Sequence, residues 1–216
     1  MSTRLLATLA VAGQLSFVAA WIVGGAIQPG YSTADQTVSE LFSRTADHPL
    51  VLWIGLAGLV PSYLATATSL HRALGSRGRA AVAMFTLAAP LVTLVLLSPL
   101  DCMTNSSAGC AARVDAGTVS ATHDLHNLAA VALQLLLVAT PFAVAFAVRG
   151  SRLVSWALGF GVLGVATILA VGASGPGQDG YGIAQRATFG FVNLWVIAIA
   201  LAAITGLRGT GRVSGR

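Results

Sequence analysis

Long apolar stretches dominate this chain, and they limit its possible folds more than any other feature. A helix rises about 1.5 Å per residue, so roughly 20 apolar residues cross the hydrocarbon core of a bilayer, which is about 30 Å thick. Cutting the sequence at its charged breaks leaves stretches of this length at residues 5–27, 50–70, 80–99, 125–148, 153–173 and 187–206. We therefore expect an all-α integral membrane protein, with a six-transmembrane-helix bundle as a single domain over residues 1–216.

Composition supports a lipid environment and argues against nucleic acid as a partner. Of the 216 residues, 56% are apolar and only 9% are charged, and the mean hydropathy is +0.80. A soluble domain of this size needs more charged surface. All basic residues are Arg, and they are scattered over short loops without forming a dense basic arm, which excludes a nucleic-acid-binding surface.

The distribution of charge along the chain predicts its orientation. One set of loops contains Arg4, Arg72, Arg77, Arg79, Arg149, Arg152, Arg208, Arg212 and Arg216, and the other set contains Arg44, Arg113 and Arg186. Because cytoplasmic loops are enriched in basic residues, we expect both termini in the cytoplasm of a plasma-membrane protein. All the Asp and Glu side chains then fall on the outer side, so we expect any functional site there.

Small residues recur inside the apolar stretches at helix-packing spacing. They are Gly55, Gly58, Gly159, Gly161 and Gly164. Small residues let helix backbones approach closely in lipid. We interpret them as packing positions of the bundle.

The two cysteines, Cys102 and Cys110, both lie in the second outer loop. An extracytoplasmic compartment favours oxidation of such a pair, so we expect a disulfide. A pair of thiolate metal ligands is the alternative.

Asp101, His123 and His126 are candidates for a metal site. The third span ends in Ser98-Pro99-Leu100-Asp101, and the fourth opens with His123 and His126, one helical turn apart on one face. Two His and a carboxylate suit a catalytic zinc or another divalent metal with a position open for water. The alternative is ordinary polarity at a membrane interface, where acids favour the N-terminus of a helix.

Glu40 has a structural and a chemical interpretation. Thr37 followed by Glu40 fits a capping box, and Val38, Leu41 and Phe42 form an apolar stripe, which predicts a short interfacial helix. Glu40 can also serve as a general acid or base whose pKa is raised by partial burial. The two roles are compatible.

Arg186 closes the last outer loop at the mouth of the sixth span. An Arg at the membrane edge can extend to water, pair with Glu40 or Asp101, or hold a phosphate or another oxyanion.

Several short motifs together resemble the bacterial integral membrane family named domain of unknown function 998. They are Gln28-Pro29-Gly30-Tyr31-Ser32, Ser39-Glu40-Leu41, Pro99-Leu100-Asp101, His123 to Asn127, and Gln185-Arg186 with Trp195. The resemblance spans nearly the whole chain and implies a six-span protein with its polar residues on one side. A weaker likeness links the Ser, Asp and paired His to membrane hydrolases of the alkaline ceramidase and adiponectin-receptor type, which have seven spans and a different His spacing.

These observations predict an enzyme acting on a lipid-like or isoprenoid substrate at the outer leaflet. In a metal-assisted hydrolase, Asp101, His123 and His126 would hold the metal, Glu40 would act as acid or base, and Arg186 would orient an anionic group. An acid-initiated isoprenoid cyclase needs no metal. The rival class is a non-catalytic partner subunit or small-ligand binder, and a haem-binding electron carrier is disfavoured because both candidate His lie on one helix.

Overall fold

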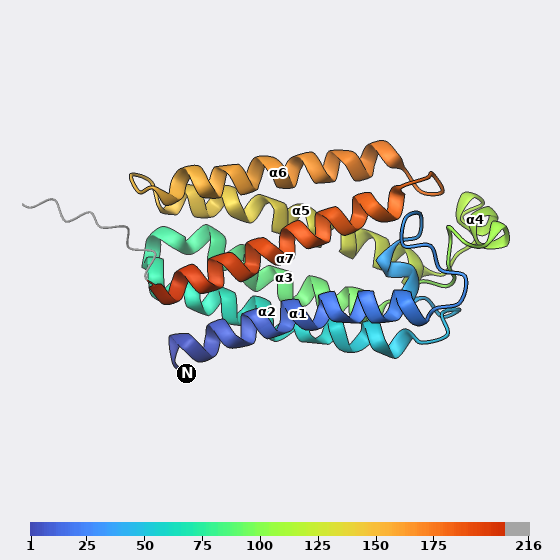
Figure 1. The fold of residues 1–216 in the computed structure, drawn as a ribbon, viewed down its shortest axis with the longest axis horizontal. Helices are drawn as coiled ribbons and strands as arrows, with labels where there is room; N and C mark the ends of the chain where they lie inside the picture. The colour runs from blue at the N-terminus through green and yellow to red at the C-terminus, as the bar shows by residue number, and fades with distance from the viewer. Residues whose placement is uncertain (206–216) are drawn as a thin grey trace, which may run out of the picture.

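The computed structural model describes residues 1–205 and shows six long helices arranged side by side (Figure 1). They are α1 (Thr3–Ile27), α2 (Pro49–Leu74), α3 (Arg79–Leu97), α5 (Ala121–Ala147), α6 (Leu153–Ser174) and α7 (Tyr181–Thr205). Three short elements complete the fold: η1 (Val38–Phe42), η2 (Gly75–Gly78) and α4 (Ala108–Asp115). The all-α prediction is confirmed, since residues 1–205 contain no strand. The predicted Arg208, Arg212 and Arg216 lie outside the described residues.

Five stretches of the described chain are long and apolar enough to cross a membrane, and one of them, Pro49–Leu97, contains both α2 and α3. These are nevertheless separate helices, because the chain turns back at η2, where Gly75 has a φ of 56°. The chain therefore forms a membrane helix bundle. The number of crossings and the side of each terminus stay predictions.

Two helices begin earlier than their apolar stretches predicted. α5 begins at Ala121 and α7 at Tyr181, whereas we expected starts at 125 and 187. In both cases a charged residue near the start of the helix, Asp124 in α5 and Arg186 in α7, set the cut and assigned the first residues of the helix to the loop. Ser120 caps α5 by accepting a hydrogen bond from the His123 backbone N–H at 3.3 Å. Residues of the predicted outer loops are therefore held at fixed positions on helices.

The helices pack in a closed sequence in which α1 contacts α2 and α7, α3 contacts α2 and α5, and α6 contacts α5 and α7. The closest approach is between α1 and α2. A Cβ added at Gly13 would lie 2.2 Å from the carbonyl oxygen of Gly58, and one at Gly55 would lie 2.5 Å from the Ala20 Cβ. The packing role predicted for Gly55 and Gly58 is thus seen in α2, whereas nothing lies within 4 Å of a Cβ at Gly159.

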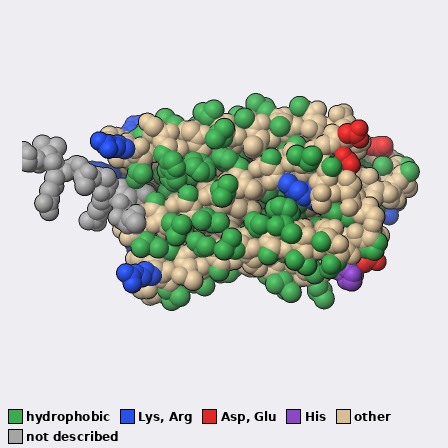
Figure 2. All heavy atoms as spheres, viewed as in Figure 1, with side chains coloured by type: hydrophobic (Ala, Val, Ile, Leu, Met, Phe, Trp, Pro, Cys, Tyr) green, Lys and Arg blue, Asp and Glu red, His purple; other side chains and the backbone are tan. Residues whose placement is uncertain are grey.

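Three connections gather at one end of the bundle, which we call the polar end: residues 28–48, 98–120 and 175–180 (Figure 1). The N-terminus lies at the opposite end. On the face drawn in Figure 2, acidic side chains appear at the polar end and basic side chains mainly at the opposite end. This matches the charge separation predicted from the loops.

Candidate functional site

The predicted short helix around Glu40 is present as the 3-10 helix η1. Its apolar residues Val38, Leu41 and Phe42 are buried, and the helix contacts α1, α2 and α7. The Gln185 side chain on α7 accepts a hydrogen bond from the Val38 backbone N–H at 2.7 Å. The helix therefore closes the polar end of the bundle, and its apolar residues point into the core. The sequence predicted an interfacial helix, with these residues on the membrane surface.

Glu40 is only 1% exposed, and both of its carboxylate oxygens accept hydrogen bonds. Oε2 accepts from the backbone N–H of Thr37 at 3.1 Å, as in the predicted capping box, and Oε1 accepts from the backbone N–H of Asn105. Burial raises the pKa of the Glu40 carboxyl above its ordinary value, although these N–H groups and the Arg186 charge oppose the shift. Glu40 thus accepts the hydrogen bonds of a structural cap and also has a raised pKa, which is a property of proton donors.

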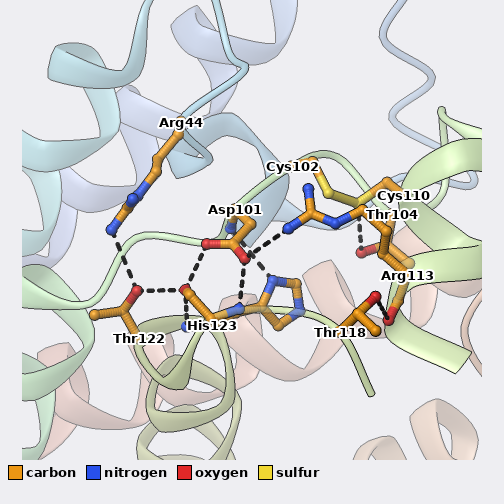
Figure 3. A network of polar contacts seen from close by, with 10 residues as sticks. Arg44, Asp101, Cys102, Thr104, Cys110, Arg113, Thr118, Thr122 and His123 are labelled. Atoms are coloured by element: carbon orange, nitrogen blue, oxygen red, sulfur yellow. Dashed lines mark hydrogen bonds and ion pairs between the residues drawn. A yellow bond between two sulfur atoms is a disulfide. The ribbon is translucent and has the colours of Figure 1, made fainter. Parts of the chain in front are cut away.

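Asp101 lies at the centre of a polar network that joins the end of α3 to the start of α5 (Figure 3). Its Oδ1 accepts from the Ser120 hydroxyl at 2.6 Å and its Oδ2 from the Ser120 backbone N–H at 2.7 Å. Arg113 forms an ion pair with Oδ2 at 3.3 Å. The hydrogen bonds from Ser120 are the main reason that the pKa of Asp101 lies below its ordinary value. Asp101 therefore holds the N-terminus of α5 in place.

His123 and His126 are both buried, and their ring nitrogens contact different parts of the chain. His123 Nδ1 accepts from the Asp101 backbone N–H at 3.3 Å, so in the neutral ring the proton is on Nε2. His126 Nδ1 lies 2.7 Å from the Ser98 carbonyl oxygen, so it donates and leaves Nε2 as an acceptor. Both side chains are enclosed by the bundle and are not exposed to solvent.

The structure does not bring Asp101, His123 and His126 together as a metal site. Within residues 1–205, no three side chains of His, Cys, Asp or Glu are grouped so that they can hold one metal ion. Both Asp101 oxygens already accept hydrogen bonds, and the His123 nitrogen opposite its hydrogen-bonded Nδ1 is protonated in the neutral ring. These residues do not fit the predicted ligand set, so we derive no step through a metal.

Arg186 binds the first connection at the polar end through neutral oxygens. Its Nη1 donates to the carbonyl oxygens of Thr33 at 2.7 Å, Gln36 at 2.8 Å and Gly182 at 3.1 Å, and its Nη2 donates to the Tyr31 hydroxyl. The predicted ion pair with Glu40 or Asp101 is absent from the described residues. Arg186 therefore positions residues 31–37, which lead into η1.

The predicted disulfide joins Cys102 to Cys110. Cys110 lies on α4, so the bond attaches this short helix to the segment just after Asp101. Arg113, which pairs with Asp101, lies on the same helix. The disulfide thus supports the network around Asp101.

A cavity of about 360 Å³ opens at the polar end between α5, α6 and α7, and we call it the polar groove. Its polar lining includes Glu40, Asn105, His123, Asn127, Tyr181 and Gln185. Its apolar lining includes Val131, Leu135, Ile168 and Val171. Glu40 and His123, two of the predicted site residues, therefore line one cavity. Asp101 and Arg186 do not line it, but they bind segments of the chain that surround it.

The sequence analysis missed Asn127, Gln134 and Asn193 as residues that line cavities. A signal was available, because polar side chains inside apolar spans are rare and usually face the interior of the bundle. Asn127 and Gln134 lie in α5 and Asn193 lies in α7. The spacing of seven residues places Asn127 and Gln134 on one face of α5, but nothing in the sequence indicated that Asn193 would line the same cavity as Gln134.

Comparison with known proteins agrees with the suspected resemblance. A model of the family described as protein of unknown function DUF998 matches residues 11–202. No curated protein matches the chain, and no solved structure does. The weaker likeness to membrane hydrolases of the ceramidase type is not confirmed by these comparisons. Because the match covers nearly all of the six-helix bundle, the chain belongs to the DUF998 family.

Proposed function

We propose that this protein is a membrane-embedded enzyme that binds a lipid-like or isoprenoid substrate in the polar groove. The observation that carries the proposal is the division of that groove into a polar part around Glu40, His123 and Asn127 and an apolar part along α5 and α6. A volume of about 360 Å³ is within the range of small-molecule sites. An amphiphile matches such a lining, with its reacting part near Glu40 and its chain along the apolar wall.

The apolar wall of the groove reaches the outer surface of the bundle. Val131 is 59% exposed and Leu135 is 53% exposed, and both line the groove. On a membrane helix such residues face the acyl chains. This supports entry of the substrate sideways from the bilayer.

Glu40 is the residue best suited to acid or base chemistry in the groove. Its raised pKa keeps a proton available closer to neutral pH than an ordinary Glu. When that proton moves to the substrate, the O–H bond of Glu40 breaks and its electron pair remains on the carboxylate. The backbone N–H groups of Thr37 and Asn105 stabilise the resulting charge.

Proton transfer from Glu40 is better supported than metal-assisted hydrolysis, because the ligand set for the metal is not assembled. An acid-initiated reaction of an isoprenoid needs only the acid and an apolar surface around the chain. Metal analysis of the purified protein tests this choice. The metal-assisted hydrolase would become the better-supported function if wild type contained one equivalent of zinc or another transition metal and Asp101→Asn lost that metal together with its activity.

The experiment that tests the function uses the full-length protein in detergent with lipid extracted from its host membrane. Mass spectrometry first identifies compounds that co-purify with it and then follows their conversion during incubation. We expect a bound amphiphile that wild type converts and Glu40→Gln retains without conversion. Asp115→Asn is the matched control, because it removes an exposed carboxylate on α4.

The same experiment separates the second candidate, a non-catalytic small-ligand binder. The buried side chains of His126, Gln134 and Asn193, each with a polar atom that has no partner among residues 1–205, favour it as the alternative. Binding without conversion in wild type supports the binder. A failure to recover any amphiphile with wild type contradicts both versions.

We also propose that the polar end faces the extracytoplasmic side. The distribution of Arg and the Cys102–Cys110 disulfide support this orientation. An impermeant maleimide applied to intact cells should label a cysteine introduced by Ala108→Cys and leave Ser76→Cys unlabelled. Labelling of Ser76→Cys alone would mean that the polar end faces the cytoplasm.

A further inference from the structure

A second, smaller cavity lies deeper in the bundle, and we call it the inner cavity. Its volume is about 60 Å³, and most of its lining is apolar, from residues such as Phe17, Leu56 and Leu137. Five polar side chains also line it: Ser39 of η1, Tyr63 of α2, His126 and Gln134 of α5, and Asn193 of α7. None of the residues lining this cavity is Asp, Glu or Arg.

His126 presents an acceptor to the inner cavity. Its Nδ1 donates to the Ser98 carbonyl oxygen, so the lone pair on Nε2 is available. The side chain is 1% exposed, and Nε2 has no hydrogen-bond partner among residues 1–205. An acceptor buried without a partner costs about 1–3 kcal/mol, so a residue of this kind calls for an explanation.

Gln134 and Asn193 present amide groups to the same cavity from facing helices. The Gln134 Nε2 and the Asn193 Nδ2 are buried and without a hydrogen-bond partner in the described part of the chain. Asn193 is 4% exposed. Gln134 lies eight residues after His126, which places both side chains on one face of α5. Three of the five polar side chains that line this small cavity thus carry an unpartnered atom.

We infer that the inner cavity binds the hydroxyl group of an uncharged, apolar ligand such as an isoprenoid or long-chain alcohol. A hydroxyl has one donor and two acceptor positions, so it can donate to His126 Nε2 and accept from the amides of Gln134 and Asn193. A phosphate or carboxylate is disfavoured, because the lining contains no Arg and burial of an unpaired charge is costly.

The size of the inner cavity shows that it holds one end of such a ligand. A water molecule occupies about 30 Å³ of the liquid, so about 60 Å³ has room for a hydroxyl and its neighbouring carbons. Ser39, Ala130, Gln134 and Phe189 line both the inner cavity and the polar groove. The rest of the ligand extends past these residues into the polar groove. The inference rests on the proposed function in one respect, because the ligand enters through that groove.

Two probes test this inference with the full-length protein in detergent: tritiated farnesol and, as its competitor, farnesyl methyl ether. The ether keeps the chain and an acceptor oxygen but cannot donate to His126. We expect farnesol to bind at least tenfold more tightly than the ether. His126→Phe and Asn193→Leu should each weaken farnesol binding about tenfold and reduce the difference between the two probes.

Conversion by wild type separates this inference from the proposed function. Asp115→Asn, at an exposed site on α4, is the control and should leave farnesol binding unchanged. If wild type binds farnesol but converts no compound, the proposed enzymatic function is contradicted and the proposed inner binding site is supported. Equal affinity for farnesol and its ether means that ordered water alone satisfies the three side chains, and this overturns the inner site.

Thermal unfolding of the variants shows whether a loss of farnesol binding is due to a loss of folding. Replacing an unpartnered amide by an apolar side chain of similar size should leave the Tm equal or higher. If Asn193→Leu does not fold, Gln134→Met makes the same comparison from α5. Unchanged farnesol affinity in every folded variant contradicts the inference.

Discussion

The Glu40 carboxylate accepts a hydrogen bond from the backbone N–H of Asn105, which lies 65 residues later in the chain. This contact joins the connection after α1 to the connection after α3, directly at the polar groove. Asn105 in turn accepts from the Gly177 backbone N–H at 2.7 Å through its side chain. All three connections at the polar end therefore meet around one buried acid.

The raised pKa of Glu40 predicts a pH-dependent stability. The folded chain binds this proton more tightly than the unfolded chain, so the stabilisation is complete below the unfolded pKa and is lost as pH rises through the folded pKa. Glu40→Gln has no such proton. The Tm of wild type relative to this variant should therefore fall between about pH 4 and the raised pKa. A difference that increases with pH over this range contradicts the predicted direction of the shift.

Asp101 predicts the opposite dependence. Its pKa is lowered by the hydrogen bonds from Ser120, so its stabilisation is present above the unfolded pKa and is lost as pH falls through the folded pKa. Asp101→Asn should lower the Tm by a few degrees at neutral pH, and the difference should begin to shrink below about pH 4 and be lost as pH falls through the lowered pKa. Asp115→Asn, at an exposed site on α4, should show little change. A difference that persists at low pH would show that charge is not the cause.

Arg186 should be needed for the order of residues 31–37. Arg186→Met removes the donors to three backbone carbonyls, and a hydrogen bond to a charged group makes a net contribution of about 1.5–3 kcal/mol. Hydrogen exchange of Ser32 to Thr37 should become faster, and Arg186→Lys should restore it only in part. Arg44→Met removes the same charge from an exposed site and should leave this exchange unchanged.

The disulfide should stabilise the polar end more than the helices. In the chain-entropy model, a bond across eight residues stabilises by roughly 2–3 kcal/mol. The double substitution Cys102→Ala with Cys110→Ala should lower the Tm and speed hydrogen exchange in α4. Reducing agent should have the same effect on wild type and no effect on the variant. A Tm that does not respond to reduction would mean that α4 is held mainly by other contacts.

Two glycines provide a matched test of helix packing. Gly13→Ala places a methyl group against the Gly58 carbonyl oxygen, which should destabilise the α1–α2 pair by about 1–3 kcal/mol. Gly159→Ala on α6 meets nothing within 4 Å and should change stability by less than about 0.5 kcal/mol. Equal Tm values for the two variants would contradict the close approach.

Much of the bundle could be predicted from the sequence, because the cost of placing charge in hydrocarbon marks each helix as an apolar stretch. The capping box around Glu40 and the disulfide were also predictable, since each depends on residues close together in the chain. Asn105 as the second donor to Glu40 was not predictable. That contact depends on the path of a connection that has no regular pattern.

The histidines show why the predicted metal site failed to assemble. An i, i+3 spacing does place His123 and His126 near one face of α5, but it does not determine what their ring nitrogens bind. The segment just after α3 supplies the Ser98 carbonyl and the Asp101 backbone N–H, and each ring binds one of them. These backbone partners cannot be identified from residue types.

If the polar groove binds the ligand that we propose, the exposed Val131 and Leu135 on its wall determine how that ligand reaches the protein. A compound that arrives through this wall is already dissolved among acyl chains and diffuses in two dimensions. Its occupancy of the site then follows its mole fraction in the bilayer, and diluting the sample with buffer has little effect on it. Affinities measured at different ratios of lipid to protein can be compared only after this correction.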